Sequence, residues 1–140
     1  MTAVWVLLAT AVLVVTVGLT LRHRSGRVRE ADAQALPPAV LAELPAATGA
    51  GRGVTLLQLS TTFCGQCRQA KALLADLAAQ TPGLRHVEVD VTDRPDLTDA
   101  LRVRSTPTTL AVDARGRELL RLVGLPRREE LLDALRPHLG

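Results

Sequence analysis

The feature that most constrains this fold is an uncharged stretch near the N-terminus, AVWVLLATAVLVVTVGLTL, which runs from Ala3 to Leu21. As a helix, this stretch is long enough to cross a hydrocarbon core of roughly 30 Å. Every charged side chain of the 140-residue chain lies after it. The sequence therefore predicts that residues 1–21 form a transmembrane anchor, and the remaining length suits one small domain.

The flanks of this stretch favour an anchor over a cleaved signal peptide. A signal peptide has a basic start, an apolar core of about 7–15 residues and a small-residue cleavage site. Here only the amino terminus is basic before the stretch, which is longer, and Arg22-His23-Arg24 follows it directly. Because positive residues prefer the cytoplasmic side, we expect a single-pass protein of the cell membrane with its domain in the cytoplasm. Only this charge asymmetry argues against the extracytoplasmic orientation.

The pI of about 9.6 suggests a nucleic-acid partner, but the distribution of charge argues against one. From Gly53 to the C-terminus there are 12 basic and 11 acidic side chains, so the domain is close to neutral. The excess arginines, mostly beside the apolar stretch, are expected to set topology and contact anionic lipid; they are Arg22, Arg24, Arg27, Arg29 and Arg52. The near absence of aromatic side chains also disfavours base stacking. We expect no nucleic-acid partner.

The rest of the chain divides into a linker and a domain. Prolines and glycines punctuate residues 22–52, which we interpret as a basic juxtamembrane linker with one short helix around Ala39–Leu44. In the domain, residues 53–140, hydrophobic periodicity predicts alternating strands and helices. The strands are 54–59, 86–91, 108–112 and 118–123, and the helices are 64–80, 95–101 and 127–139. This order predicts an α/β fold with a mixed central sheet and helices on both faces, the first two strands parallel and the last two a hairpin.

Two cysteines, in Cys64-Gly65-Gln66-Cys67, directly follow a predicted buried strand and open a predicted helix. The first turn of a helix offers unpaired N–H groups and the positive end of the helix dipole, so we expect the pKa of Cys64 to lie below that of a free thiol. Two intervening residues let a disulfide close with little backbone movement. We therefore interpret Cys64 as the outer, nucleophilic sulfur and Cys67 as the deeper sulfur that resolves a mixed disulfide.

Two other interpretations of this pair remain open. Half of a zinc site would need two further ligands, and only His23, His86 and His138 are available, at no zinc-finger spacing. The other alternative is a fortuitous pair of buried cysteines, which the position between strand and helix disfavours. We expect no metal and no cofactor beyond the Cys64–Cys67 disulfide. The histidines His86 and His138 are expected at the surface.

Four segments of the domain resemble the thioredoxin family. The run FCGQCR, from Phe63 to Arg68, is similar to the family's aromatic-CGPC-Lys motif, and Val87–Val91 is like its central strand. Val103–Thr108 matches the family's cis-proline loop, and Val123-Gly124 precedes the last helix as in the family. The resemblance covers about Val54 to Leu139 and implies a thioredoxin-like fold.

The resemblance also implies a site. It marks as active-site neighbours Phe63, Gly65, Gln66 and Arg68, and as the substrate-binding loop Ser105, Thr106 and Pro107, with Gly124. Pro107 would be cis and face the dithiol, while the backbone of Thr106 would pair with an extended substrate segment as an added strand does. An ordinary trans Thr-Pro bond is the alternative. The implied partners are protein disulfide substrates and an unidentified thiol reductant.

Two departures from the family bear on the chemistry. The family usually has a buried acid six residues before the first cysteine, where this chain has Gln58, which cannot take a proton as a carboxylate does. The proline inside the family's active-site dipeptide is Gln66 here, which leaves the redox potential open. The segment between Val91 and Val103 is too short for the helical insert of periplasmic disulfide-forming oxidases, so a reductase is favoured.

Three functions are compatible with these patterns. The first is a membrane-tethered thioredoxin-like protein-disulfide reductase, which we expect. The second is an extracytoplasmic thiol donor, including a reductase of the cytochrome-maturation type. The third is a redox-sensing module that binds a partner without turnover.

Overall fold

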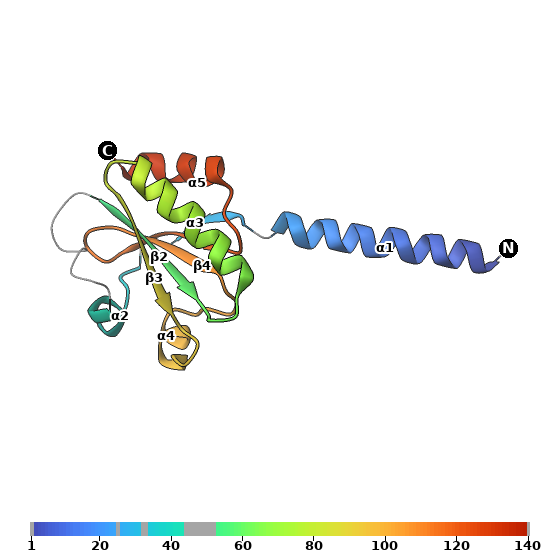
Figure 1. Cartoon of the computed structure of the whole chain (residues 1–140), viewed down its shortest axis with the longest axis horizontal. Coiled ribbons are helices and arrows are strands. Elements are labelled where there is room, and N and C mark those ends of the chain that lie inside the picture. The colour runs from blue at the N-terminus through green and yellow to red at the C-terminus, as the bar shows by residue number, and fades with distance from the viewer. Residues whose placement is uncertain (1, 25, 32–33, 44–52, 140) are drawn as a thin grey trace.

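The computed structural model describes residues 2–24, 26–31, 34–43 and 53–139. The first helix, α1 (Thr2–Arg24), extends away from the rest of the molecule (Figure 1). Its stretch Thr2–Leu21 is long and apolar enough to cross a membrane, and none of it is buried inside the protein. By length and composition this helix fits a membrane span, although a signal sequence passes the same test.

Among the described residues, five strands form one sheet in the order β1-β5-β4-β2-β3. They are β1 (Val28–Glu30), β2 (Val54–Ser60), β3 (Leu84–Asp90), β4 (Thr108–Val112) and β5 (Glu118–Val123). β2 runs parallel to β3 and β4 pairs antiparallel with β5, as the sequence predicts, and the structure adds that β4 also runs antiparallel to β2. Every residue of β2 is buried, which explains why its sequence is mostly apolar instead of alternating.

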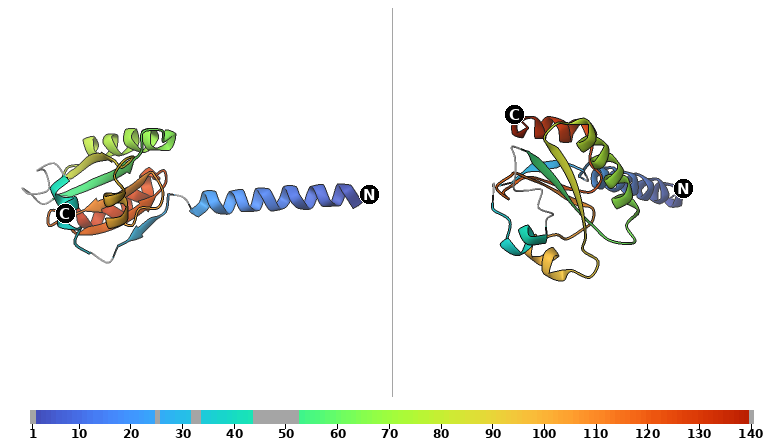
Figure 2. Two further views of the ribbon diagram at one scale, coloured as in Figure 1. Left: turned by 90° about the horizontal axis from the view of Figure 1, so that it is seen from below. Right: turned by 60° about the vertical axis from the view of Figure 1, so that its left-hand side comes forward.

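Helices cover both faces of the sheet, so the predicted α/β architecture is confirmed (Figures 1 and 2). On one face lie α3 (Gly65–Gln80) and α5 (Arg128–Leu135), which is followed by a 3₁₀ turn (Arg136–His138). On the other face lie α2 (Pro38–Glu43) and α4 (Pro95–Ala100). The buried side chains form two clusters, one for each face. The cluster on the first face includes Leu56, Leu74, Leu77, Leu131 and Leu135, and that on the second includes Leu36, Val40, Leu57, Leu97 and Leu110.

The segment predicted to be a linker belongs in part to the folded domain. β1 pairs antiparallel with β5, with Val28 opposite Leu122. Leu36 and Val40 are only 5% and 3% exposed. The interpretation as a linker was wrong here because it weighed the prolines and missed these apolar side chains, which complete the core. The predicted short helix is present as α2, and Leu44 lies outside the described residues.

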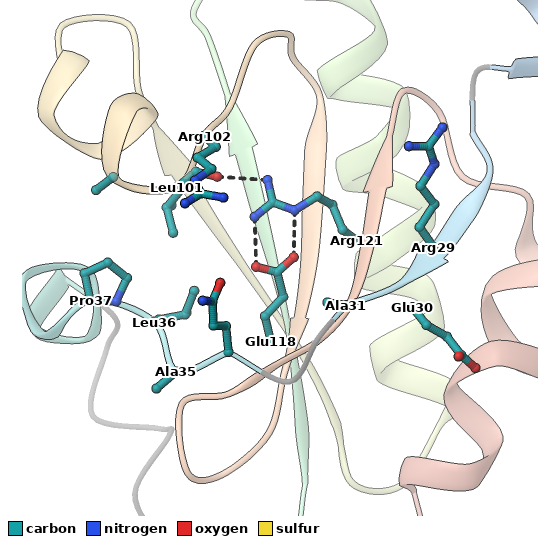
Figure 3. A pocket seen from close by; sticks show the side chains of 12 residues that line it. Arg29, Glu30, Ala31, Ala35, Leu36, Pro37, Leu101, Arg102, Glu118 and Arg121 are labelled. Atoms are coloured by element: carbon teal, nitrogen blue, oxygen red, sulfur yellow. Dashed lines mark hydrogen bonds and ion pairs between the residues drawn. The ribbon is translucent and has the colours of Figure 1, made fainter.

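This segment also forms a cavity of about 580 Å³ with the end of α4 (Figure 3). Inside it, Arg121 forms an ion pair with Glu118, 2.6 Å away, and donates to the carbonyl oxygen of Leu101 at 2.8 Å. These contacts connect β5 to α4. Neither cysteine lines this cavity, so it is separate from the site built around the dithiol.

Candidate functional site

The two cysteines lie where β2 ends and α3 begins. Cys64 is the N-cap of α3, with extended backbone dihedrals, and its Sγ accepts the N–H of Cys67 at 3.1 Å. This sulfur takes the place that the oxygen of a serine or threonine cap has in other helices. Cys64 and Cys67 form a disulfide, with their Cα atoms 5.2 Å apart.

The two sulfurs differ in their access to solvent. Cys67 belongs to the first turn of α3 and is 2% exposed, whereas Cys64 is only half-buried. Cys64 is therefore the sulfur that a partner can reach. In the reduced protein, the N–H of Cys67 and the other unpaired N–H groups of this turn would stabilise a thiolate there. The neighbouring residues Gly65 and Gln66 are exposed, and Phe63 is 93% exposed.

The predicted substrate loop lies beside this turn. The Thr106–Pro107 peptide bond is cis, and the hydroxyl of Thr106 is 3.3 Å from that of Thr61. The carbonyl oxygen of Pro107 accepts the N–H of Gly124 at 2.8 Å. Gly124 has a φ of +91°, which favours glycine. Ser105, which precedes Thr106 in the loop, is exposed, and its carbonyl oxygen accepts a hydrogen bond from the hydroxyl of Thr108 at 2.7 Å. The structure thus brings the predicted loop, Gly124 and the dithiol turn to one end of the sheet.

A groove of about 270 Å³ opens next to the disulfide. It is lined by both cysteines and by Ser60, Thr61, Thr62, Arg68, Lys71, Glu88 and Asp90. Glu88 accepts a hydrogen bond from the hydroxyl of Ser60 at 2.9 Å and pairs with Lys71 at 2.6 Å. Burial disfavours the charged form of Glu88, but its bonds to Lys71 and Ser60 outweigh this and lower its pKa. Lys71 is not among the predicted site residues, although its spacing of four residues from Cys67 places both on one helical face.

Behind the dithiol, Gln58 is fully buried. Its Nε2 donates to the carbonyl oxygen of Cys67 at 2.9 Å, and its Oε1 accepts a hydrogen bond from Nε2 of His86 at 2.9 Å. A neutral amide with both ends bonded thus occupies the position where the thioredoxin resemblance implies an acid. The buried face of β2 therefore holds no carboxylate at this point.

The expectation that His86 lies at the surface was wrong. The parallel register of β2 and β3 places His86 opposite Leu56, on the face that α3 covers, so its ring is half-buried against Gln58. Burial lowers the pKa of His86, because desolvation disfavours the imidazolium; Glu88 opposes this change and Lys71 adds to it. His138, by contrast, is exposed as expected.

Within the described parts of the chain, no three His, Cys, Asp or Glu side chains are grouped so that they could hold a metal ion. The site consists of a disulfide at the N-terminus of a helix, a proline loop beside it and a polar groove. An accessible sulfur that is paired with a covered one, on a mixed sheet between helices, defines a dithiol oxidoreductase.

Comparisons with known proteins agree with this class. The family model described as a thioredoxin-like domain matches residues 42–138. The thioredoxin of Chlamydia trachomatis is 30% identical over 86 residues, which are 61% of this chain and 83% of that protein. A thioredoxin of Staphylococcus aureus is 33% identical over 88 residues, which are 62% of this chain and 84% of that protein.

A solved structure is also similar. A mutant thioredoxin from Halobacterium salinarum aligns with a TM-score of 0.57 at 27% identity, covering 64% of this chain and 77% of that one. This chain belongs to the thioredoxin-like family. Members of the family are in general disulfide oxidoreductases, act on protein disulfides and need no cofactor beyond the redox disulfide.

Proposed function

We propose that this chain is a membrane-tethered protein-disulfide reductase whose catalytic residues are Cys64 and Cys67. The observation that carries the proposal is the pairing of a half-buried Cys64, which accepts the N–H of Cys67, with a Cys67 that is only 2% exposed. In the reduced protein, the sulfur of Cys64 would be open to a substrate and stabilised as a thiolate, with the covered sulfur of Cys67 available to resolve the mixed disulfide.

The reaction starts from the reduced protein. The thiolate of Cys64 attacks one sulfur of a substrate disulfide, so that a bond from Cys64 to this sulfur forms and the substrate bond breaks. The departing substrate thiolate takes a proton from water. Cys67 then loses its proton to water and attacks the sulfur of Cys64, which forms the intramolecular disulfide and releases the second substrate thiolate, and this thiolate also takes a proton from water. Two electrons and two protons reach the substrate, and a separate dithiol must restore the protein.

The loop Ser105–Pro107 would hold the substrate during this exchange. Support comes from the contact between Thr106 and Thr61 at 3.3 Å, which places the loop beside the turn that leads into Cys64. An extended substrate segment that pairs with the backbone of Thr106 would pass directly over Cys64. Gly124, which is bonded to Pro107, supports the loop from the side of β5.

A reductase assay on the full chain tests the catalytic role. With dithiothreitol as donor and insulin as substrate, the wild type should reduce disulfides and Cys64→Ser should not. Cys67→Ser should still attack through Cys64 but accumulate mixed disulfides, because the resolving sulfur is missing. A wild type as inactive as Cys64→Ser would contradict the proposal and favour a module that binds without turnover.

The tether and its orientation need a separate test. The exposed apolar α1 and the arginines that follow it support a single span with the domain on the cytoplasmic side. A reporter fused after Gly140 that is active only in the cytoplasm should give a signal in membrane fractions. A signal only from a reporter that needs the exterior would contradict this orientation and favour the extracytoplasmic thiol donor.

A further inference from the structure

The point at which α1 joins the domain is set by Gly26. Its N–H donates to the carbonyl oxygen of Val123, at the end of β5, over 2.8 Å. Gly26 is buried with a φ of +82°, and a Cβ there would collide with the carbonyl oxygen of Leu125. Only glycine fits this close backbone contact. Since α1 ends at Arg24, only two residue steps join it to Gly26, and two steps can span at most roughly 7 Å.

This attachment lies at the same end of the sheet as the dithiol. The residue after Val123 is Gly124, whose N–H donates to Pro107 at 2.8 Å. The adjoining Thr106 contacts Thr61 through their hydroxyls, and the carbonyl oxygen of Thr61 accepts the N–H of Cys64 at 3.2 Å. In Figures 1 and 2, the N-terminal end of α3 is the end nearer to α1, on the side of the domain from which α1 leaves. The catalytic end of the domain therefore faces the anchor.

The following inference rests on the proposed membrane tether. If Leu21 marks the edge of the hydrocarbon, the last three residues of α1 add about 4.5 Å and the chain to Gly26 adds at most roughly 7 Å. The headgroup layer is about 5–8 Å thick on each side of a bilayer. Gly26 therefore lies within roughly 7 Å of the outer limit of the headgroups, and the catalytic end cannot move far from the membrane.

The surface at this end combines apolar and cationic side chains with the carboxylates of Glu88 and Asp90, which line the groove beside the disulfide. Phe63 is 93% exposed, Val123 45% and Leu125 37%. Three exposed arginines are neighbours in sequence of residues already described at this end. Arg27 follows Gly26, Arg68 follows Cys67, and Arg104 precedes Ser105. Cationic side chains are attracted to anionic headgroups, and exposed apolar side chains suit an apolar partner surface. This composition fits a partner that lies in the membrane.

We propose that the substrate disulfide is carried by an integral membrane protein and lies at the surface of the bilayer. A soluble protein would have to fit its folded bulk between the bilayer and the catalytic end, where the tether leaves little space. A membrane protein presents its cysteines at the height of Cys64 and diffuses in the same plane, which raises their effective concentration. The chemical step is the exchange described above, in which Cys64 and Cys67 give two electrons and two protons to that disulfide.

The test compares two disulfide probes in vesicles of phosphatidylcholine and phosphatidylglycerol that contain the reduced full chain. Both probes are single-span peptides with the same disulfide-bonded loop. In one the loop directly follows the membrane segment; in the other a helical linker of about 20 residues holds it about 30 Å farther out. Both probes share the membrane with the protein, so they differ only in height. We expect the near loop to be reduced at least about tenfold faster.

The matched control is an insertion of about 12 glycine and serine residues between Arg24 and Ser25, which lengthens the tether by roughly 20 Å and leaves the Gly26 contact intact. It should reduce both loops at similar rates. Equal rates with the wild-type tether, or faster reduction of the far loop, would overturn the inference. A protein that reduces oxidised glutathione but neither loop would also overturn the inference. In that case Cys64 is active, but lipid keeps disulfides of membrane proteins away from the catalytic end. If no disulfide is reduced in a manner that depends on Cys64, the proposed function itself fails.

Discussion

The buried amide of Gln58 supports a quantitative prediction about the domain. Gln58→Leu keeps the approximate size of the side chain but removes two hydrogen bonds, one to the carbonyl oxygen of Cys67 and one from His86, each 2.9 Å long. The carbonyl oxygen of Cys67 retains the regular helical N–H four residues later. The ring of His86, which is half-buried, loses its acceptor.

The magnitude follows from these contacts. Each neutral hydrogen bond contributes about 0.5–1.5 kcal/mol, so the two together contribute about 1–3 kcal/mol. Leucine regains roughly 1 kcal/mol, because more apolar surface is buried at this fully covered position. The difference is about 0–2 kcal/mol, so we expect Gln58→Leu to lower the free energy of unfolding by about 1 kcal/mol.

Urea unfolding of the oxidised full chain in detergent micelles, followed by circular dichroism, measures this change. With a slope of about 1–3 kcal/mol per molar urea, a loss of about 1 kcal/mol should lower the midpoint by roughly 0.3–1 M. None of the stretch Thr2–Leu21 of α1 is buried inside the protein. The urea transition therefore reports the unfolding of the domain. Gln69→Leu, at an exposed position of α3, is the matched control and should leave the midpoint unchanged. An unchanged or higher midpoint for Gln58→Leu would refute the reasoning, because burial of leucine would then outweigh both hydrogen bonds.

Three further predictions use the same assay. Leu36→Ala should cost about 2–4 kcal/mol because Leu36 is 5% exposed in the core, and an unchanged midpoint would restore the linker interpretation. Asp113→Ala should cost about 1–3 kcal/mol near neutral pH, since Asp113 accepts the backbone N–H groups of Arg115 and Arg117, both at 2.9 Å. Partial burial disfavours the charge of Asp113, but its bonds to Arg117 and Arg115 outweigh this and lower its pKa. The cost should therefore shrink as the pH falls below about 4, and a constant cost would contradict this. Burial lowers the pKa of His86, so the unfolded chain binds the proton first and stability should fall as the pH drops below about 6.5. His86→Gln should remove this part of the pH dependence, and an unaltered pH profile would show that His86 does not cause it.

The sequence predicted the elements of the domain where a local pattern exists. β2 was recognisable as a short apolar run and α3 as a stripe of leucines that starts at the cysteines. β1 has no such signal, because it is three residues long, two of them charged, and it is a strand only through its pairing with β5. His86 was misplaced for a related reason. The alternating valines of β3 indicated one buried face, and only the packing of α3 makes the opposite face partly buried as well.

The sequence by itself determined the features that depend on neighbouring residues: an apolar helix long enough for a membrane, a dithiol at the start of a helix, and the order of strands and helices from β2 onward. It reached the loop at Pro107 only through a resemblance. The tertiary structure decided the contacts between distant segments, namely the amide of Gln58 against His86 and the attachment of Gly26 beside Gly124. The physical reason is that strand order and register set these contacts, and both depend on how all the elements pack together.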